Sequence, residues 1–214
     1  MVCYRIGIID DDESKVIEIV DKLAHAFESV PEYQNYGLVP IEIEATNDME
    51  ETLETIISKN IECMIIDYNL SSSSGFNGVE LANALWSYRK HLPVFMLTSF
   101  DEAMYTHELF SAYQIFNYDR YLREPLEQND IHKKIVREIE IYHKKIASWE
   151  AELLKLLERK GESAEIDSRI MELDSELEST INGQGSIPQK IKSDFSESVL
   201  QKLINDIERI LEGD

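Results

Sequence analysis

The chain has 214 residues, of which 42 are acidic and 21 basic, and its formal net charge at pH 7 is −21. Nucleic acids and anionic membrane surfaces are bound by clustered Lys and Arg, so this excess of acid argues against both as partners. We expect a cytoplasmic protein without a signal peptide or a membrane-spanning helix, in which Cys3 and Cys63 are small buried hydrophobic residues and not a disulfide.

The first 125 residues alternate short apolar runs with amphipathic segments. The patterns predict strands at 4–9, 41–45, 63–66, 94–98 and 118–122, and helices at 14–28, 49–59, 79–89 and about 102–113. Four of the strands are near-continuous runs of large apolar residues, which is typical of strands covered on both faces. The strand at 41–45 alternates apolar and acidic residues, which indicates an edge strand. This alternation of strand and helix predicts an α/β fold with a doubly wound parallel sheet.

The pattern changes at residue 128, where apolar residues begin to recur at spacings of four and three. These residues are Ile135, Ile139, Tyr142, Ile146, Trp149, Leu153 and Leu156. The heptad seam predicts an all-α region at 128–214, with helices at about 128–160, 164–181 and 194–212. No such helix can bury its apolar stripe alone. We favour a homodimeric coiled coil, and an intramolecular helical bundle is the alternative.

Acidic residues follow two of the predicted strands. Asp10, Asp11 and Asp12 come directly after the first strand, and Asp67 follows the third. If the first and third strands are neighbours, as in the flavodoxin-like order, Asp10, Asp11 and Asp67 converge at one edge of the sheet. Carboxylate oxygens suit Mg²⁺, which would offset their repulsion and leave one carboxylate to act as a nucleophile towards phosphorus. The simpler interpretation is a helix N-terminus whose dipole favours acidic residues.

Four segments in order, "IIDDDES", "MIIDYNL…GFNGVEL", "VFMLTS" and "YDRYLREP", resemble the receiver domain of two-component response regulators. The resemblance covers residues 1–127 and implies a flavodoxin-like, five-stranded parallel sheet. It also implies that Asp67 accepts a phosphoryl group. Asp10 and Asp11 would hold Mg²⁺ together with Asp67 and the backbone carbonyl of Asn69.

The same resemblance assigns roles at the last two strands. Thr98 would bond the phosphoryl oxygen through its hydroxyl, and Tyr121 on the fifth strand would be an aromatic switch. Receiver domains carry a Lys before the proline that follows the fifth strand, but Glu124 stands at that place here. Arg123 is the expected substitute. The loop at 71–77 is also longer than the family usually has.

We therefore expect a phosphorylation-dependent response regulator, which is not an enzyme apart from catalysing its own phosphoryl transfer. A histidine kinase or a phosphotransfer protein would donate the phosphoryl group, and the helical region would act on a protein partner, not on DNA. The alternative is a pseudo-receiver scaffold in which Glu124 has disabled the switch. A third, weaker hypothesis is a phosphotransferase-like module that presents His132 or His143.

Overall fold

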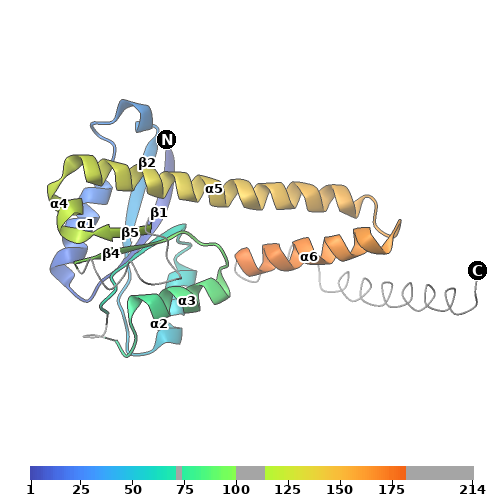
Figure 1. Cartoon of the computed structure of the whole chain (residues 1–214), viewed down its shortest axis with the longest axis horizontal. Helices are drawn as coiled ribbons and strands as arrows, with labels where there is room; N and C mark the ends of the chain where they lie inside the picture. The colour runs from blue at the N-terminus through green and yellow to red at the C-terminus, as the bar shows by residue number, and fades with distance from the viewer. Residues whose placement is uncertain (71–73, 100–113, 182–214) are drawn as a thin grey trace, which may run out of the picture. The chain divides into compact units, whose positions relative to one another are not determined.

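The computed structural model describes residues 1–70, 74–99 and 114–181, and Figure 1 labels their helices and strands. The helices predicted at about 102–113 and 194–212 lie outside the described residues. The chain divides into two compact units, Met1–Tyr142 and His143–Asp214.

The first unit is built on a five-stranded sheet (Figure 1). Its strands are β1 (Val2–Ile9), β2 (Tyr36–Glu42), β3 (Cys63–Ile66), β4 (Val94–Thr98) and β5 (Ile115–Asn117). Their order is β2-β1-β3-β4-β5 and every pair is parallel. This is the flavodoxin-like order, with its topological switch point between β1 and β3, and it confirms the predicted fold class.

Helices cover both faces of this sheet. The first unit contains α1 (Glu13–Ala24), a short 3₁₀ turn η1 (Pro31–Tyr33), α2 (Met49–Ser58), α3 (Gly78–Tyr88), α4 (Tyr118–Arg123) and the first part of α5 (Pro125–Leu157), whereas α6 (Ala164–Thr180) belongs to the second unit. Asp12, Asp48 and Asn77 cap α1, α2 and α3 with their side chains, so each helix begins where a polar residue can accept from its first free N–H groups. Across the described ranges, no helix combines the length and the apolar character that crossing a membrane requires.

The second strand begins earlier than predicted. β2 runs from Tyr36 to Glu42 and pairs with β1 from Val2↔Tyr36 to Ile8↔Glu42, so only its end overlaps the prediction at 41–45. Pro40 lies inside it, although proline usually marks a turn. A proline is accommodated here because β2 is an edge strand, whose outward N–H groups need no partner in the sheet.

The fifth strand was predicted in the wrong place. β5 ends at Asn117, and the segment predicted as a strand at 118–122 is helix α4. The side chain of Asn117 accepts from the backbone N–H of Arg120 at 3.0 Å and caps the helix. Ion pairs at i, i+4, such as Arg123 with Asp119 at 3.3 Å, also suit a helix. A short apolar run fits either structure, so periodicity alone could not separate the two.

The first half of α5 belongs to the core of the first unit. Ile131, Ile135 and Ile139 are buried in one hydrophobic cluster with the apolar side of α1 and the sheet. At the end of α3, the Arg89 guanidinium donates to the hydroxyl of Tyr142 at 3.3 Å. Because this half of α5 packs in the first unit, the first unit ends at Tyr142, inside α5. The sequence suggests an earlier boundary, at 127/128.

In the second unit, the later half of α5 packs against α6. Leu153 of α5 is buried with Ile170, Leu173 and Leu177 of α6, and Ile146 and Trp149 pack against them. Gly161, with a positive φ of 87°, lies in the turn that joins the two helices. The heptad seam is thus covered within the chain, as the bundle alternative has it, and the homodimeric coiled coil stays a prediction.

The cysteines differ in exposure. Both are free, as expected, and Cys63 is buried in β3. Cys3 is exposed, so the expectation that both are buried was wrong for this residue. It is the second residue of β1, and the buried part of this strand begins only at Tyr4.

His132 provides a test of how α5 is packed. Its ring is buried, Nε2 lies 3.0 Å from the hydroxyl of Tyr121, and Nδ1 has no hydrogen-bond partner among the described residues. Burial lowers the pKa of His132 to about 4. The unfolded chain takes up this proton near pH 6.5, so it binds more protons than the folded state between pH 6.5 and about 4, and the folded state loses stability as the pH falls through that range.

We predict that His132→Gln removes this pH-dependent component. Between pH 7 and pH 4.5, the wild type should lose roughly 2–3 kcal/mol more of its unfolding free energy than the variant does. Urea unfolding at the two pH values measures it, with the exposed His143→Gln as the matched control. An equal difference at both pH values would contradict the prediction.

Gly78 provides a test of how closely the start of α3 packs against β3 and β4. A β-carbon there would collide with the backbone carbonyl of Asp67 and approach Ile66 and Met96 to 2.9 Å, whereas one at Gly75 would meet its nearest atom only at 4.0 Å. We predict that Gly78→Ala lowers the free energy of unfolding by about 1–3 kcal/mol and that Gly75→Ala changes it by less than about 0.5 kcal/mol. Urea unfolding of both variants gives the comparison, and equal effects would refute it.

Candidate functional site

Three carboxylates meet at the carboxyl edge of the sheet. Ile9 of β1 and Ile66 of β3 are partners in register, so Asp10 and Asp67 leave adjacent strands side by side. Carboxylate oxygens of Asp10, Asp11 and Asp67 all lie within 4.8 Å of one another. The sheet order therefore brings together the three residues that the sequence analysis expected to converge.

Two of these carboxylates are largely removed from water. The side chains of Asp10 and Asp67 are only 3% and 4% exposed. Burial raises the pKa of Asp10 to about 6, and the nearby charge of Asp67 acts in the same direction. Burial also raises the pKa of Asp67, while Lys15 and the backbone N–H groups of Tyr68 and Asn69 oppose the shift. Both shifts mean that positive charge at this edge of the sheet is favourable.

A lysine that the sequence analysis missed supplies such a charge. Nζ of Lys15, in the first turn of α1, lies 3.8 Å from Oδ2 of Asp10 and 3.7 Å from Oδ2 of Asp67. The ammonium also lies 5.4 Å from the centre of the Tyr118 ring. Side chains in a helix lean towards its N-terminus, so a Lys in the first turn after the aspartate run was a usable signal.

The aspartate run has two functions. Asp12 is exposed, and its carboxylate accepts from the backbone N–H of Ser14 at 2.9 Å as the N-cap of α1. Its own N–H donates to Asp10 at 2.9 Å. The simpler interpretation, a helix N-terminus that attracts acid, therefore holds for Asp12, while Asp10 and Asp11 belong to the cluster.

The cluster has the donor set that a small hard cation requires. Mg²⁺ binds oxygen at 2.0–2.1 Å in octahedral geometry, so its ligand oxygens lie about 3 Å apart when adjacent and about 4.2 Å apart when opposite. The carboxylate oxygens of the cluster all lie within 4.8 Å of one another, so they can approach these distances. Asp10, Asp11 and Asp67 would therefore hold Mg²⁺ after small side-chain movements. The backbone carbonyl ligand expected from Asn69 stays a prediction.

Thr98 lies at the same edge of the sheet. It is buried as the last residue of β4 and pairs in register with Asn117 of β5. The adjacent Ser99 is exposed. This position is compatible with the expected contact between the Thr98 hydroxyl and a phosphoryl oxygen, which stays a prediction.

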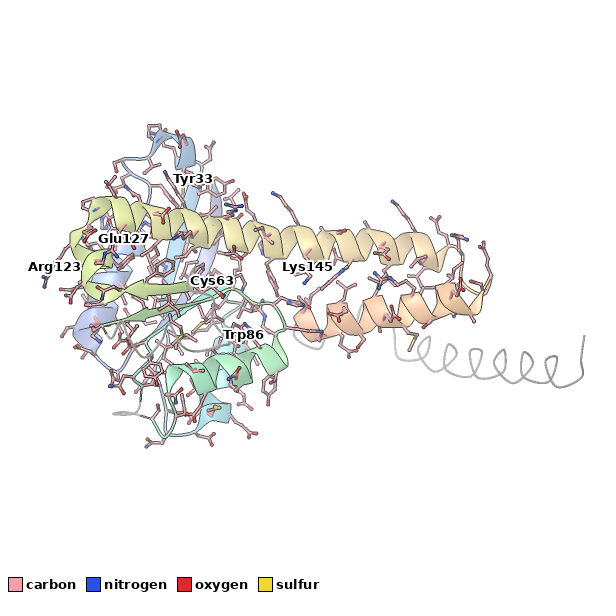
Figure 2. All side chains as sticks on the ribbon, viewed as in Figure 1. Tyr33, Cys63, Trp86, Arg123, Glu127 and Lys145 are labelled. Carbon is pink, nitrogen blue, oxygen red and sulfur yellow. The ribbon has the colours of Figure 1, made fainter. Side chains whose placement is uncertain are left out.

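Arg123 and Glu124 do not stand at the end of the fifth strand. Helix α4 separates both from β5, and Arg123 is 80% exposed, pairs with Asp119 at 3.3 Å and points outward (Figure 2). Glu124 is exposed and lies 3.6 Å from Arg120. The expectation that either residue occupies the position of the family's Lys depended on a strand at 118–122 and was wrong. The strand-end position belongs to Asn117.

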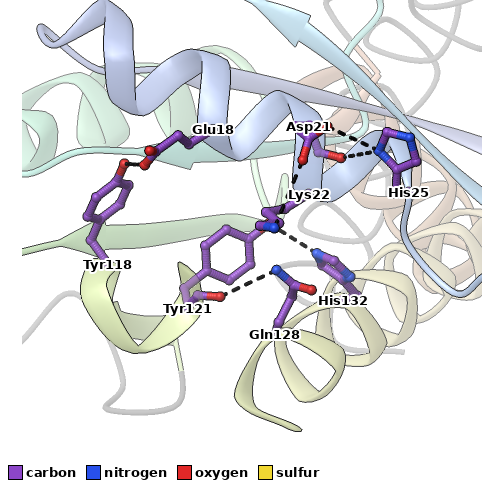
Figure 3. A network of polar contacts seen from close by, with 8 residues as sticks. All are labelled: Glu18, Asp21, Lys22, His25, Tyr118, Tyr121, Gln128 and His132. Carbon is purple, nitrogen blue, oxygen red and sulfur yellow. Dashed lines mark hydrogen bonds and ion pairs between the residues drawn. The ribbon is translucent and has the colours of Figure 1, made fainter. Parts of the chain in front are cut away.

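Tyr121 is a core residue of α4, and its predicted place on the fifth strand was wrong. Its ring is fully buried, and its hydroxyl and carbonyl contact His132 and Gln128 of α5 (Figure 3). The aromatic residue next to the cluster is instead Tyr118, whose hydroxyl donates to Glu18 of α1 at 2.6 Å (Figure 3). Because His132 is buried as well, it is not presented to a partner.

The end of the long loop before α3 is well defined by hydrogen bonds. Residues 71–73 lie outside the described part. The buried hydroxyl of Ser74 contacts the carbonyls of Leu70 at 2.8 Å and Phe76 at 2.9 Å. Asn77 and Glu80 then form a capping box that starts α3 beside Asp67.

No family model and no curated protein matches the chain. One similar structure is a fusion containing the trimeric coiled coil of yeast Spc42, with 20% identity, a TM-score of 0.47, and coverage of 76% of this chain and 94% of that chain. The anti-anti-sigma factor PhyR from Bartonella quintana is 18% identical, with a TM-score of 0.43 over 71% of this chain. The constitutive lysine decarboxylase of E. coli is 14% identical, with a TM-score of 0.41 over 74%.

The chain spans 52% of the PhyR chain and 20% of the decarboxylase chain. At these identities and TM-scores the similarities support no functional conclusion. The assignment of the fold rests on the strand order itself.

Proposed function

We propose that the chain is a cytoplasmic signalling protein that accepts a phosphoryl group on Asp67 with Mg²⁺, in the manner of a response-regulator receiver. The single observation that carries the proposal is the meeting of Asp10, Asp11 and Asp67 at the β1–β3 switch point. Open parallel sheets place their chemistry there. Buried like charges are costly, so a cluster of this kind is best explained by a ligand that needs it.

The proposed step is a displacement at phosphorus. A carboxylate oxygen of Asp67 attacks the phosphorus of a phosphohistidine or of a small acyl phosphate, and a new P–O bond forms. The bond from phosphorus to the donor breaks, and its electron pair leaves with the donor group. Asp67 becomes an acyl phosphate. Bound Mg²⁺ would neutralise the charge that approaches this carboxylate cluster.

The proposed output runs through helices to a protein partner. Tyr118 bonds Glu18 of α1, and Tyr121 bonds His132 of α5, so the short helix α4 joins the side of the site to the long helix. The later half of α5 carries the helical hairpin with α6. The heptad seam is already buried between α5 and α6, so a homodimer through this seam would require the two helices to separate. Light scattering of the full chain measures whether it is a monomer or a dimer.

A phosphorylation-independent scaffold is the second candidate. Glu124 no longer favours it, because this residue pairs with Arg120 and not with the cluster. Two other observations do: β5 ends in Asn117 and not in Lys, and Lys15 already pairs with Asp67. In that function the ion pairs would stabilise the carboxylates permanently, and the helices would bind their partner constitutively.

Phosphorylation by a small donor separates the two candidates. We predict that wild type, given acetyl phosphate and Mg²⁺, gains one phosphoryl group by intact-protein mass spectrometry and that Asp67→Asn gains none. The exposed Asp119→Asn serves as the matched control and should label like wild type. Labelling should also stop when Mg²⁺ is removed with a chelator. Equal labelling of wild type and Asp67→Asn, or none in wild type, would reject the proposed acceptor.

A further inference from the structure

We propose that Lys15 is the residue that binds the phosphoryl group on Asp67. This inference deepens the proposed function and rests on it. Lys15 reaches the cluster from the first turn of α1, and its ammonium lies 3.7 Å from Oδ2 of Asp67 and 3.8 Å from Oδ2 of Asp10. The cation that the sequence analysis sought after the fifth strand is therefore provided by α1, after the first strand.

The charge change at Asp67 requires such a residue. The unmodified side chain carries one negative charge, whereas an acyl phosphate carries its charge on three phosphoryl oxygens, close to −2 at neutral pH. These oxygens would lie beyond Oδ2, in a region where Asp10 and Asp11 are also negative. Mg²⁺ would offset the two charges of Asp10 and Asp11, but the phosphoryl group adds close to two more, so its oxygens would still be repelled without a second cation. The Lys15 ammonium, a compact charge on a flexible stem, can follow them.

The position of Lys15 allows this exchange of partners. Its two ion pairs are longer than a hydrogen bond, so the ammonium is near both carboxylates without being tied to either. The side chain is 23% exposed, so the ammonium is not locked inside the core and has room to shift between partners. The Tyr118 ring lies 5.4 Å from Nζ and provides a cation–π contact that keeps the ammonium near the cluster.

Two other candidates for the role are engaged elsewhere. Arg123 is exposed and paired with Asp119 at 3.3 Å. Asn117, at the carboxyl end of β5, uses its side-chain oxygen to cap α4 and carries no charge. Thr98 can donate one neutral hydrogen bond, but it cannot offset a full charge.

The same geometry makes Lys15 a competitor of the metal. In the unmodified protein its ammonium partly neutralises the carboxylates that would hold Mg²⁺. Removing its charge should therefore leave Mg²⁺ affinity unchanged or raise it, while slowing phosphoryl addition. A residue that only supported the structure would lower both, together with the melting temperature.

The test compares three variants of the full chain. Lys15→Met keeps most of the stem without the charge, Lys15→Arg keeps the charge, and Lys22→Met removes a charge from the same helix. Lys22 lies beside Asp21, at 3.9 Å, and away from the cluster. Labelling by acetyl phosphate is followed by mass spectrometry, Mg²⁺ binding by calorimetry, and folding by thermal melting.

We expect Lys15→Met to label at least about tenfold more slowly, which corresponds to about 1.4 kcal/mol of lost transition-state stabilisation. Its Mg²⁺ affinity should be equal or higher. Lys15→Arg should recover part of the rate, and Lys22→Met should match wild type.

Three outcomes would overturn the role of Lys15. If Lys15→Met labels at the wild-type rate while Asp67→Asn does not label, Lys15 is not needed and the proposed function stands. If labelling, Mg²⁺ affinity and melting temperature all fall together, Lys15 is structural. If wild type itself does not label, the proposed function fails and the role of Lys15 fails with it.

Discussion

The first unit depends on a repulsive contact that its own topology enforces. Parallel pairing of β1 with β3 in the register Ile9↔Ile66 places Asp10 and Asp67 side by side, and neither can retreat into solvent because both side chains are almost fully covered. Moving the strands apart would break the centre of the sheet. The structure accommodates the repulsion locally instead, with backbone N–H groups directed at both carboxylates and with an ammonium from α1. Negative charge concentrated in this way attracts cations and, when a cation is present, phosphoryl oxygens as well.

The strands that could be predicted from the sequence are those whose residues are all buried. β3 and β4 were predicted at their observed bounds, because a strand covered on both faces must be apolar throughout and polar residues mark its ends. The predicted start of α2 was correct, and that of α3 was one residue late. β2 was predicted only at its end, since an edge strand tolerates Pro40. β5 was misplaced because it has only three residues and a capped helix follows it at once, so the longer segment at 118–122, with its Tyr and Leu residues, was assigned as the strand.

The site divides in the same way. Asp10, Asp11 and Asp67 could be found because each follows a strand, and strand ends meet at a predictable edge of the sheet. Lys15 and Tyr118 could not be assigned from strand ends, because their roles depend on how α1 and α4 pack. Arg123, Glu124 and Tyr121 were misassigned for one shared reason, the misplaced fifth strand. The wrong position of this one strand therefore led to wrong roles for three residues. The predicted convergence of the acids was unaffected, because it depends only on β1 and β3.

Helix α5 explains why the position of α4 matters for the signalling that we propose. Its first half is part of the core that surrounds α1, and its second half is one side of the hairpin with α6, so one continuous helix belongs to both units. Such a helix transmits a change only if something at its beginning has two arrangements. Lys15 is the natural origin of a change, because its charge is shared among Asp10, Asp67 and the Tyr118 ring, and Tyr118 is the first residue of α4. The fully buried pair of Tyr121 and His132 lies one turn further on and joins α4 rigidly to α5. A movement of Tyr118 would therefore reach α5 through a packed contact and not through a flexible loop.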